Sequence, residues 1–327
     1  MRVLVTGGGG FIGSHLTEYL LEQGNHVIVV DDFSTGNRRN LERIADHPRL
    51  QIHSVDLGDP VVVRKVCEGI DSVYHLAAAV GVALIAKHPM ESIHRNIYPT
   101  QLLLDELRRL YHAGRCPTLF LASTSEVYGK NPKPVWNESD DLVFGATTKP
   151  RWSYGASKAI DEFLCLANVR ESNMKIVIGR FFNVVGPRQT GAYGMVLPRF
   201  VSAAMEGHPL IVHDDGLQER CFAHVSDVIQ GVTRLMNTSA AFGKIFNIGS
   251  DQPISILEMA RRVISIVNPK SSIQFQSYAE AYDDDFEDIR RRVPDLSRIK
   301  NTIGYAPQLD LDAIVRDVWR SMREAKG

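Results

Sequence analysis

The sequence has no marked excess of charge of either sign. It holds 37 Lys and Arg residues against 38 Asp and Glu residues, a formal net charge of -1. This balance argues against a nucleic-acid scaffold and against a polybasic membrane surface. No apolar run approaches the roughly 20 residues that a membrane-spanning helix needs. The short run from Val3 to Val5 leads into glycines rather than into a signal-peptide cleavage site. We therefore expect a cytoplasmic protein without a membrane or nucleic-acid partner.

Cysteine is also scarce, and its spacing argues against a disulfide-rich protein and against a site built on a Cys-x-x-Cys pair. The four cysteines form no Cys-x-x-Cys pair and are scattered, at Cys67, Cys116, Cys165 and Cys221. Isolated buried thiols in a reducing compartment are favoured over a disulfide framework, and we expect no metal. The 44% hydrophobic and 23% charged content is ordinary for a globular enzyme. A length of 327 residues suits one large α/β domain or two lobes.

Short β-branched runs alternate with helical patterns through the first half of the chain. This alternation predicts an α/β fold, a doubly wound parallel sheet covered by helices. The near-continuous apolar character of the runs suits strands buried on both faces. Strands are expected at 2–6, 26–30, 51–54, 72–76, 118–122 and 175–180, and helices at 14–23, 60–68, 99–113 and 154–170.

The alternation weakens after Arg180, where loops rich in Gly and Pro appear. We expect residues 1–180 to form a dinucleotide-binding domain, to which a helix at 225–236 and a strand at 244–248, within 225–250, return. Residues 181–224 and 251–327 are expected to form a smaller C-terminal α/β substrate lobe, with helices at 198–207, 254–267 and 309–323.

A glycine motif follows the first expected strand and opens the first expected helix. Gly7, Gly10 and Gly13 have the spacing G-x-x-G-x-x-G. In this setting the glycines permit a tight turn, close approach of the backbone to a pyrophosphate, and close packing of helix on strand. The helix amino terminus offers free N–H groups to the phosphates. The motif predicts a Rossmann-type dinucleotide site.

Carboxylates after the second and third expected strands suggest which dinucleotide binds. Asp31 and Asp32 end the second strand, about twenty residues past the glycines, where a carboxylate accepts the adenosine ribose hydroxyls. The same charge repels a 2′-phosphate, so NAD is favoured over NADP, with Asp31 the better candidate. Asp56 and Leu57 could bracket the adenine, and a helix-capping role for Asp56 is the alternative.

Tyr154 and Lys158 are spaced i and i+4 on one expected helix and therefore share a face. An ammonium near a phenol lowers the phenol pKa from about 10 toward neutrality. The pair on its own recurs by chance on helices as a packing pair. Downstream of a dinucleotide motif, it predicts a base for hydride transfer at an alcohol carbon.

With these motifs in place, the whole chain resembles an extended short-chain dehydrogenase/reductase of the nucleotide-sugar epimerase/dehydratase/decarboxylase group. The resemblance is carried by Thr6–Gly13, His75–Ala78, Ser123–Gly129, the Tyr154/Lys158 pair and Arg180–Asn183. It implies that Thr124 helps hold the sugar 4-hydroxyl, that the tyrosine takes its proton, and that the lysine also binds the nicotinamide ribose. It further implies that Asn96 supports the active site.

The predicted site can be stated residue by residue. The expected catalytic residues are Thr124, Glu126, Tyr154, Lys158 and Arg292. The expected NAD contacts are Gly7, Gly10, Phe11, Ile12, Gly13, Asp31, Asp32, Asp56, Leu57, Leu76, Ala77, Ala78, Asn96, Tyr154 and Lys158. The expected UDP-sugar contacts are Ser125, Asn183, Arg188, Arg220 and Arg292, with Asn183 and Arg220 at the phosphates.

The reaction that follows sugar oxidation depends on a few positions. Related dehydratases carry an adjacent Asp-Glu pair where this chain has Ser125-Glu126, so dehydration lacks its proton donor. The segment Ser123–Gly129, which contains Glu126, resembles the corresponding segment of UDP-glucuronate decarboxylases. The segments Arg151–Tyr154 and Arg292–Asp295 resemble segments of the same enzymes. In those enzymes the arginine of the second segment lies at the sugar carboxylate.

Two observations favour a UDP-sugar 4-epimerase instead. The segment His75–Val82 reads more like epimerases, and Arg292 belongs to a charge run whose simpler interpretation is a solvated surface stretch. We therefore expect a UDP-glucuronate decarboxylase, with a UDP-sugar 4-epimerase as the alternative. A homodimer is expected through the helices at 99–113 and 154–170, because Leu102, Leu103, Ile160 and Leu164 exceed what one sheet face needs.

Overall fold

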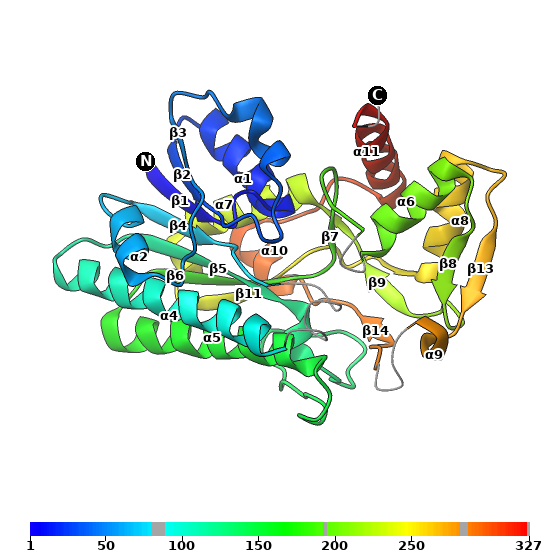
Figure 1. Ribbon diagram of the computed structural model, residues 1–327. Helices are drawn as coiled ribbons and strands as arrows, with labels where there is room; N and C mark the ends of the chain where they lie inside the picture. The colour runs from blue at the N-terminus through cyan, green and yellow to red at the C-terminus, as the bar shows by residue number, and fades with distance from the viewer. Residues whose placement is uncertain (80–88, 192–194, 282–286, 326–327) are drawn as a thin grey trace.

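A seven-stranded parallel sheet forms the centre of the larger lobe. The structure is a computed structural model that describes residues 1–79, 89–191, 195–281 and 287–325 (Figure 1). The strand order is β11-β6-β5-β4-β1-β2-β3. The strands are β1 (Arg2–Thr6), β2 (His26–Val30), β3 (Leu50–His53), β4 (Ser72–His75), β5 (Thr118–Thr124), β6 (Ile176–Phe181) and β11 (Lys244–Ile248). All neighbouring pairs run parallel, so the predicted Rossmann-type α/β sheet is confirmed.

Helices cover both faces of this sheet because its strands are apolar on both sides. In β1, Val3 and Val5 face one hydrophobic cluster and Leu4 faces the other. The first cluster packs under α1 (Phe11–Glu22), α7 (Val225–Met236) and α10 (Ser297–Ile303). The second packs under α2 (Pro60–Val66), α4 (Pro89–His112) and α5 (Trp152–Ser172). Figure 1 shows α4 and α5 side by side along one face.

One helix start differs clearly from the sequence expectation. The helix expected to begin at Pro99 begins ten residues earlier, and Pro99 lies inside α4. Proline usually marks the first turn of a helix, because it lacks the N–H that an interior position donates. The longer helix carries Asn96 toward the loop after β4, where its side chain holds Ala79.

The smaller lobe has its own hydrophobic cluster. It packs α6 (Val196–Glu206), α8 (Ile256–Val267) and α11 (Leu311–Glu324) against a parallel pair of β8 (Leu210–His213) and β13 (Ile273–Gln276). A second small sheet has the order β12-β9-β14, from Pro253–Ser255, Glu219–Cys221 and Arg291–Arg292. In Figure 1, β9 and β14 lie between the large sheet and the smaller lobe.

Short elements complete the described chain. They are η1 (Arg38–Ile44), η2 (Ser125–Tyr128), β7 (Val184–Val185), β10 (Ala223–His224), η3 (Ser239–Ala241) and α9 (Tyr278–Ala281). All four cysteines are free thiols; three are buried and Cys116 is exposed, so only part of the expectation of buried thiols holds. No helix within the described residues is both long enough and apolar enough to cross a membrane.

Candidate active site

The glycine motif forms a tight turn between β1 and α1. Gly7 has a φ of +71°, and a Cβ on Gly13 would lie 2.1 Å from the Gly7 carbonyl oxygen, so helix and turn touch. Gly10 is the N-cap of α1 and has no side-chain cap, and no acidic residue lies in the first turn. The amide groups at this terminus are therefore open to an anion. Phe11 and Ile12 begin the helix and pack against the first cluster.

Asp31 and Asp32 play different parts at the edge of this turn. Asp31 accepts hydrogen bonds from Gly9 N at 2.8 Å and Phe33 N at 2.7 Å. Burial raises the pKa of Asp31, while these backbone donors partly offset the effect. Asp32 is paired with Arg95 at 2.8 Å. Asp31 therefore lies directly on the glycine loop, which suits the ribose contact predicted for it.

The other residues predicted to contact NAD differ in their burial and in their hydrogen-bond partners. Asp56 accepts a hydrogen bond from Gly58 N, and the N-cap of α2 is Asp59, so the alternative of a helix-capping role for Asp56 is wrong. Leu57 is buried in the second cluster. Leu76, Ala77 and Ala78 are partly exposed beyond β4, and a Cβ on Gly7 would lie 2.7 Å from Ala77 N. Residues 80–82 of the epimerase-like segment lie outside the described residues.

Gly155 allows α5, the helix that carries Tyr154, to pack closely on η2, the turn that follows Thr124. Thr124 ends β5, and its hydroxyl accepts a hydrogen bond from Glu126 N at 3.2 Å, which leaves the hydroxyl proton for another partner. A Cβ on Gly155 would lie 2.6 Å from the Glu126 carbonyl oxygen, so α5 packs closely on η2. Tyr154, the preceding residue, is thereby placed beside the Thr124–Glu126 turn. Ser125 is buried.

The electrostatics of Tyr154 differ from the sequence expectation. Burial raises the pKa of Tyr154, and the carboxylates of Glu126 and Asp161 raise it further. Lys158 donates to Asp161 at 2.9 Å, so its charge is already compensated. The expected lowering of the phenol pKa by Lys158 is therefore not present in this structure. The sequence reading missed Asp161, because a carboxylate three residues after a lysine is a common surface pattern.

Glu126 lies between two arginines. Its Oε1 is 2.5 Å from Arg292 Nη2, and its Oε2 is 3.5 Å from Arg151 Nη2. Burial alone would raise the pKa of Glu126, but the two arginines outweigh it and the net shift is downward. Arg220 aligns with Arg292 across β9 and β14. Burial and Arg292 lower the pKa of Arg220 to about 10.

The charged residues at 287–292, the described part of the charge run that contains Arg292, form ion pairs. Glu287 contacts Lys130 at 2.7 Å, and Asp288 contacts Arg220 at 2.9 Å. Tyr278 also donates to Asp288, at 2.6 Å. The remaining basic residues pair as Arg290 with Asp215, Arg291 with Glu219 and Arg292 with Glu126. The interpretation as a solvated surface stretch is therefore wrong for Arg292, whose side chain is 11% exposed, whereas Arg290 and Arg291 are 57% and 41% exposed. Asp283, Asp284 and Asp285 of the run lie outside the described residues.

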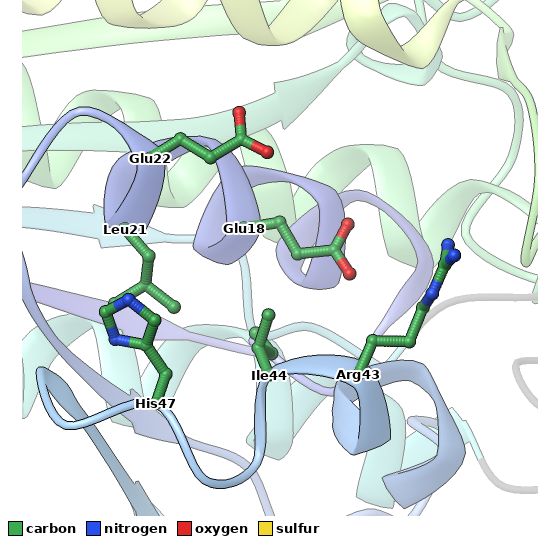
Figure 2. Close-up of a pocket in the computed structure, with 6 residues that line it drawn as sticks. All are labelled: Glu18, Leu21, Glu22, Arg43, Ile44 and His47. Carbon is green, nitrogen blue, oxygen red and sulfur yellow. The ribbon is translucent and has the colours of Figure 1, made fainter.

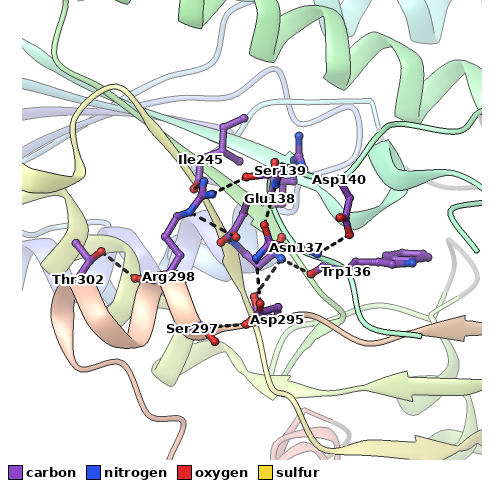
Figure 3. A network of polar contacts seen from close by, with 12 residues as sticks. Trp136, Asn137, Glu138, Ser139, Asp140, Ile245, Asp295, Ser297, Arg298 and Thr302 are labelled. Atoms are coloured by element: carbon purple, nitrogen blue, oxygen red, sulfur yellow. Dashed lines mark hydrogen bonds and ion pairs between the residues drawn. The ribbon is translucent and has the colours of Figure 1, made fainter. Parts of the chain in front are cut away.

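A polar network surrounds Asp295, three residues after Arg292, and includes its hydrogen bond from Asn137 (Figure 3). Trp136 N donates to the Val293 carbonyl oxygen at 2.8 Å, and Asp295 N donates to the Trp136 carbonyl oxygen at 2.8 Å. These bonds join the chain after β14 to the chain after η2. Because Arg292 precedes one of these segments and Glu126 precedes the other, the bonds help to keep the two side chains in contact.

Two other predicted substrate contacts lie directly before β7 and against α1. Asn183 has a φ of +27° and donates to the Cys221 carbonyl oxygen at 3.1 Å, which ties β7 to β9. Arg188 donates to Ser14 at 3.1 Å and to Glu18 at 2.6 Å. Arg188 thus contacts the glycine-motif helix, and its role at the substrate stays a prediction.

Two surface depressions contain none of the predicted site residues. One of about 270 Å³ lies between α1 and η1, where Figure 2 shows Glu18, Leu21, Glu22, Arg43, Ile44 and His47. The other, of about 440 Å³, lies beside α6. No group of three or more His, Cys, Asp or Glu residues in the described part of the chain could hold a metal ion. The candidate site is therefore defined by the contacts of the predicted residues described above and not by either depression.

Comparisons with known proteins agree with this arrangement. The family model for the NAD dependent epimerase/dehydratase family matches residues 3–249. UDP-N-acetyl-alpha-D-glucosaminuronate decarboxylase of Bacillus cytotoxicus is 36% identical over 324 residues, 99% of this chain and 98% of that protein. UDP-glucuronic acid decarboxylase 1 of Xenopus tropicalis is 32% identical and covers 95% of this chain and 69% of that protein.

Solved structures show the same fold. The UDP-glucuronic acid 4-epimerase from Bacillus cereus, in complex with UDP-glucuronic acid and NAD, has a TM-score of 0.88 and 27% identity. That similarity covers 99% of this chain and 100% of the other chain. The fold and site define a dinucleotide-dependent enzyme of the extended short-chain dehydrogenase/reductase type. The chain belongs to the NAD-dependent epimerase/dehydratase family, and NAD is its cofactor.

Proposed function

We propose that this enzyme decarboxylates a UDP-hexuronate through a transient 4-keto sugar. The observation that carries the proposal is the clamp of Arg292 and Arg151 around Glu126, beside the Tyr154 helix. A neutral hexose needs no such concentration of cationic side chains, whereas a hexuronate brings a carboxylate that needs compensation. UDP-glucuronate is the substrate expected from the sequence. The full-length similarity to a UDP-N-acetylglucosaminuronate decarboxylase makes the 2-acetamido hexuronate the second candidate.

Each proposed residue has a defined task. NAD, when bound, supplies the reversible hydride acceptor at sugar carbon 4. Tyr154 removes the proton of the 4-hydroxyl, which Thr124 orients, and later returns it. In the 4-keto acid the bond to the carboxylate breaks, its electron pair moves toward the ketone oxygen, and carbon 5 then takes a proton. Arg292 holds the departing carboxylate, and Glu126 acts at carbon 5 directly or through water.

We also propose how the chain divides this work between its lobes. Residues 1–180 and 225–250 would bind NAD, supported by the position of β11 at the edge of the main sheet. Residues 181–224 and 251–327 would bind the nucleotide sugar, supported by the separate hydrophobic cluster of α6, α8 and α11, although α10 packs on the main sheet. A cytoplasmic location fits the four unpaired cysteines.

We further propose a homodimer through α4 and α5, with a face that shares only Ile160 with the residues expected from the sequence. Leu103 is buried in the core, and Leu102 and Leu164 pack against it. The exposed apolar residues on these two helices include Met90, Ile93, Ile160 and Phe163, with Phe163 68% exposed. Such a face on adjacent helices suits pairing with a second copy.

A UDP-sugar 4-epimerase is the second candidate, favoured by the structural similarity to UDP-glucuronic acid 4-epimerase. The test is incubation with UDP-glucuronate, UDP-N-acetylglucosaminuronate and UDP-glucose, read by mass spectrometry and proton NMR. Loss of carbon dioxide from a hexuronate supports the proposal. A product of unchanged mass from any of the three would support the epimerase instead.

A further inference from the structure

Lys158 has a buried counter-ion on its own helix. Its Nζ donates to Asp161 Oδ2 at 2.9 Å, and the two side chains are 2% and 0% exposed. A buried ion pair of this kind is costly to break, because the remaining charge has no compensation. The pair lies on one stripe of α5, since Tyr154, Lys158 and Asp161 are spaced i, i+4 and i+7. Asp161 is therefore part of the electrostatic environment of the proposed base.

The family resemblance gives Lys158 the task of supporting Tyr154 and the nicotinamide ribose. A lysine whose charge is compensated at 2.9 Å acts on a neighbouring phenol less strongly than a free ammonium does. The Asp161 charge also opposes formation of a phenolate directly. Both effects depend on the charge of Asp161 and not on its volume, so they can be separated from packing.

We propose that Asp161 is a positioning residue that fixes the Lys158 ammonium and sets, through its charge, the pH range in which Tyr154 acts as a base. This inference rests on the proposed role of Tyr154. It applies equally to a decarboxylase and to a 4-epimerase, because both begin with the same proton removal at the 4-hydroxyl.

The other charged groups around the site do not duplicate this role. Glu126 on η2 also influences Tyr154, but it is compensated by Arg292 and Arg151. His75 on β4 is buried between Thr6 and Thr100, and burial followed by the Lys158 charge lowers its pKa to about 3, so it is neutral.

Two further titratable side chains lie near Asp161, which also has a hydrogen bond with the Thr100 side chain. Glu162, the next residue on α5, is paired with Arg180 of β6 at 2.7 Å. Burial raises the pKa of the Cys165 thiol, and Asp161 adds to the effect, so this thiol is neutral as well. Asp161 is thus the carboxylate that contacts Lys158 directly.

Asp161→Asn is the direct test, because it removes the charge while keeping the shape. Glu162→Gln is the matched control: it also removes a buried, ion-paired carboxylate from α5, but one that pairs with Arg180 instead of Lys158. For each protein, kcat is measured against pH on whichever UDP-sugar is turned over. Thermal unfolding is recorded in parallel.

We expect the acidic limb of the kcat profile to move about one pH unit lower in Asp161→Asn, because loss of a negative charge favours the phenolate. Asp161→Glu, which restores the charge, should return the limb toward its wild-type position. Glu162→Gln should leave the limb in place even where it lowers the unfolding temperature.

An Asp161→Asn profile that overlays the wild-type profile, with only thermal stability changed, would overturn the proposal. If Asp161→Asn does not fold, Asp161→Ser is read in the same way. The test is independent of the product formed. If the enzyme proves to be an epimerase, the acidic limb of the kcat profile can still be measured on the substrate that it epimerises. If the proposal for Asp161 is wrong, the acidic limb of Asp161→Asn stays at its wild-type position on every substrate.

Discussion

Arg292 Nη2 lies 2.5 Å from Glu126 Oε1, which joins the short strand β14 to the turn that follows Thr124. The two residues are far apart in the sequence, and the bonds between Trp136 and the chain after Arg292 hold them together. The contact is a preformed carboxylate–guanidinium pair beside the proposed base. A substrate carboxylate entering this site would find cationic groups already ordered, which lowers the cost of binding it.

Tyr154→Phe should abolish turnover while NAD stays bound, because the phenol moves a proton and contributes little to cofactor affinity. The expected loss in kcat is on the order of 10²–10⁴. Steady-state kinetics and the NAD content of the purified variant check this. Near-normal activity would remove Tyr154 from the mechanism.

Asp31→Asn should weaken NAD binding by about tenfold and reduce discrimination against NADP, because one charge-assisted contact to the ribose is lost. Asp32→Asn is the control, since Asp32 is already paired with Arg95. Calorimetric titration with both dinucleotides measures the effect. A larger loss in the control than in Asp31→Asn would move the ribose contact to Asp32.

The Glu126 pair should make stability depend on pH in one direction. The folded-state pKa of Glu126 is lowered, because Arg292 and Arg151 outweigh the effect of burial. The pair therefore stabilises the fold above the ordinary glutamate range of about 4.3, and this stabilisation is lost as the pH falls below it. The difference in unfolding temperature between wild type and Glu126→Gln should thus shrink on acidification. A difference that stays constant with pH would contradict this sign.

Phe163→Glu should convert the proposed dimer to a monomer. Phe163 is 68% exposed on α5, and a charge placed in a self-complementary interface meets its own copy. Phe275→Glu is the control, because Phe275 is 55% exposed on β13 in the other lobe. Light scattering at micromolar concentration separates the outcomes. A wild-type protein that is already monomeric would refute the dimer.

Much of this architecture could be predicted because its signals are local. The boundaries of β1 and β2 follow from runs of apolar β-branched residues, and the glycine turn follows from spacing alone. The start of α4 was missed because Pro99, usually a first-turn residue, lies inside the helix. Local patterns carry no information on distant partners.

The candidate site shows this limit most clearly. Arg292 and Glu126 are both predicted as site residues from the family resemblance, but their direct contact could not be predicted, since the two residues come from remote parts of the chain. Asp161 was missed for a different reason. Its spacing from Lys158 is common on helix surfaces, and only burial of both side chains distinguishes this pair.

The most direct test of the central claim is carbon dioxide release from a UDP-hexuronate by wild type, Glu126→Gln and Arg292→Ala. We expect each variant to lose at least about tenfold, the size of one charge-assisted contact. Transient NADH absorbance should survive better in Glu126→Gln, because oxidation at carbon 4 precedes the step assigned to Glu126. The contrary result is no carbon dioxide from the wild type, with both variants interconverting a neutral UDP-hexose at the wild-type rate.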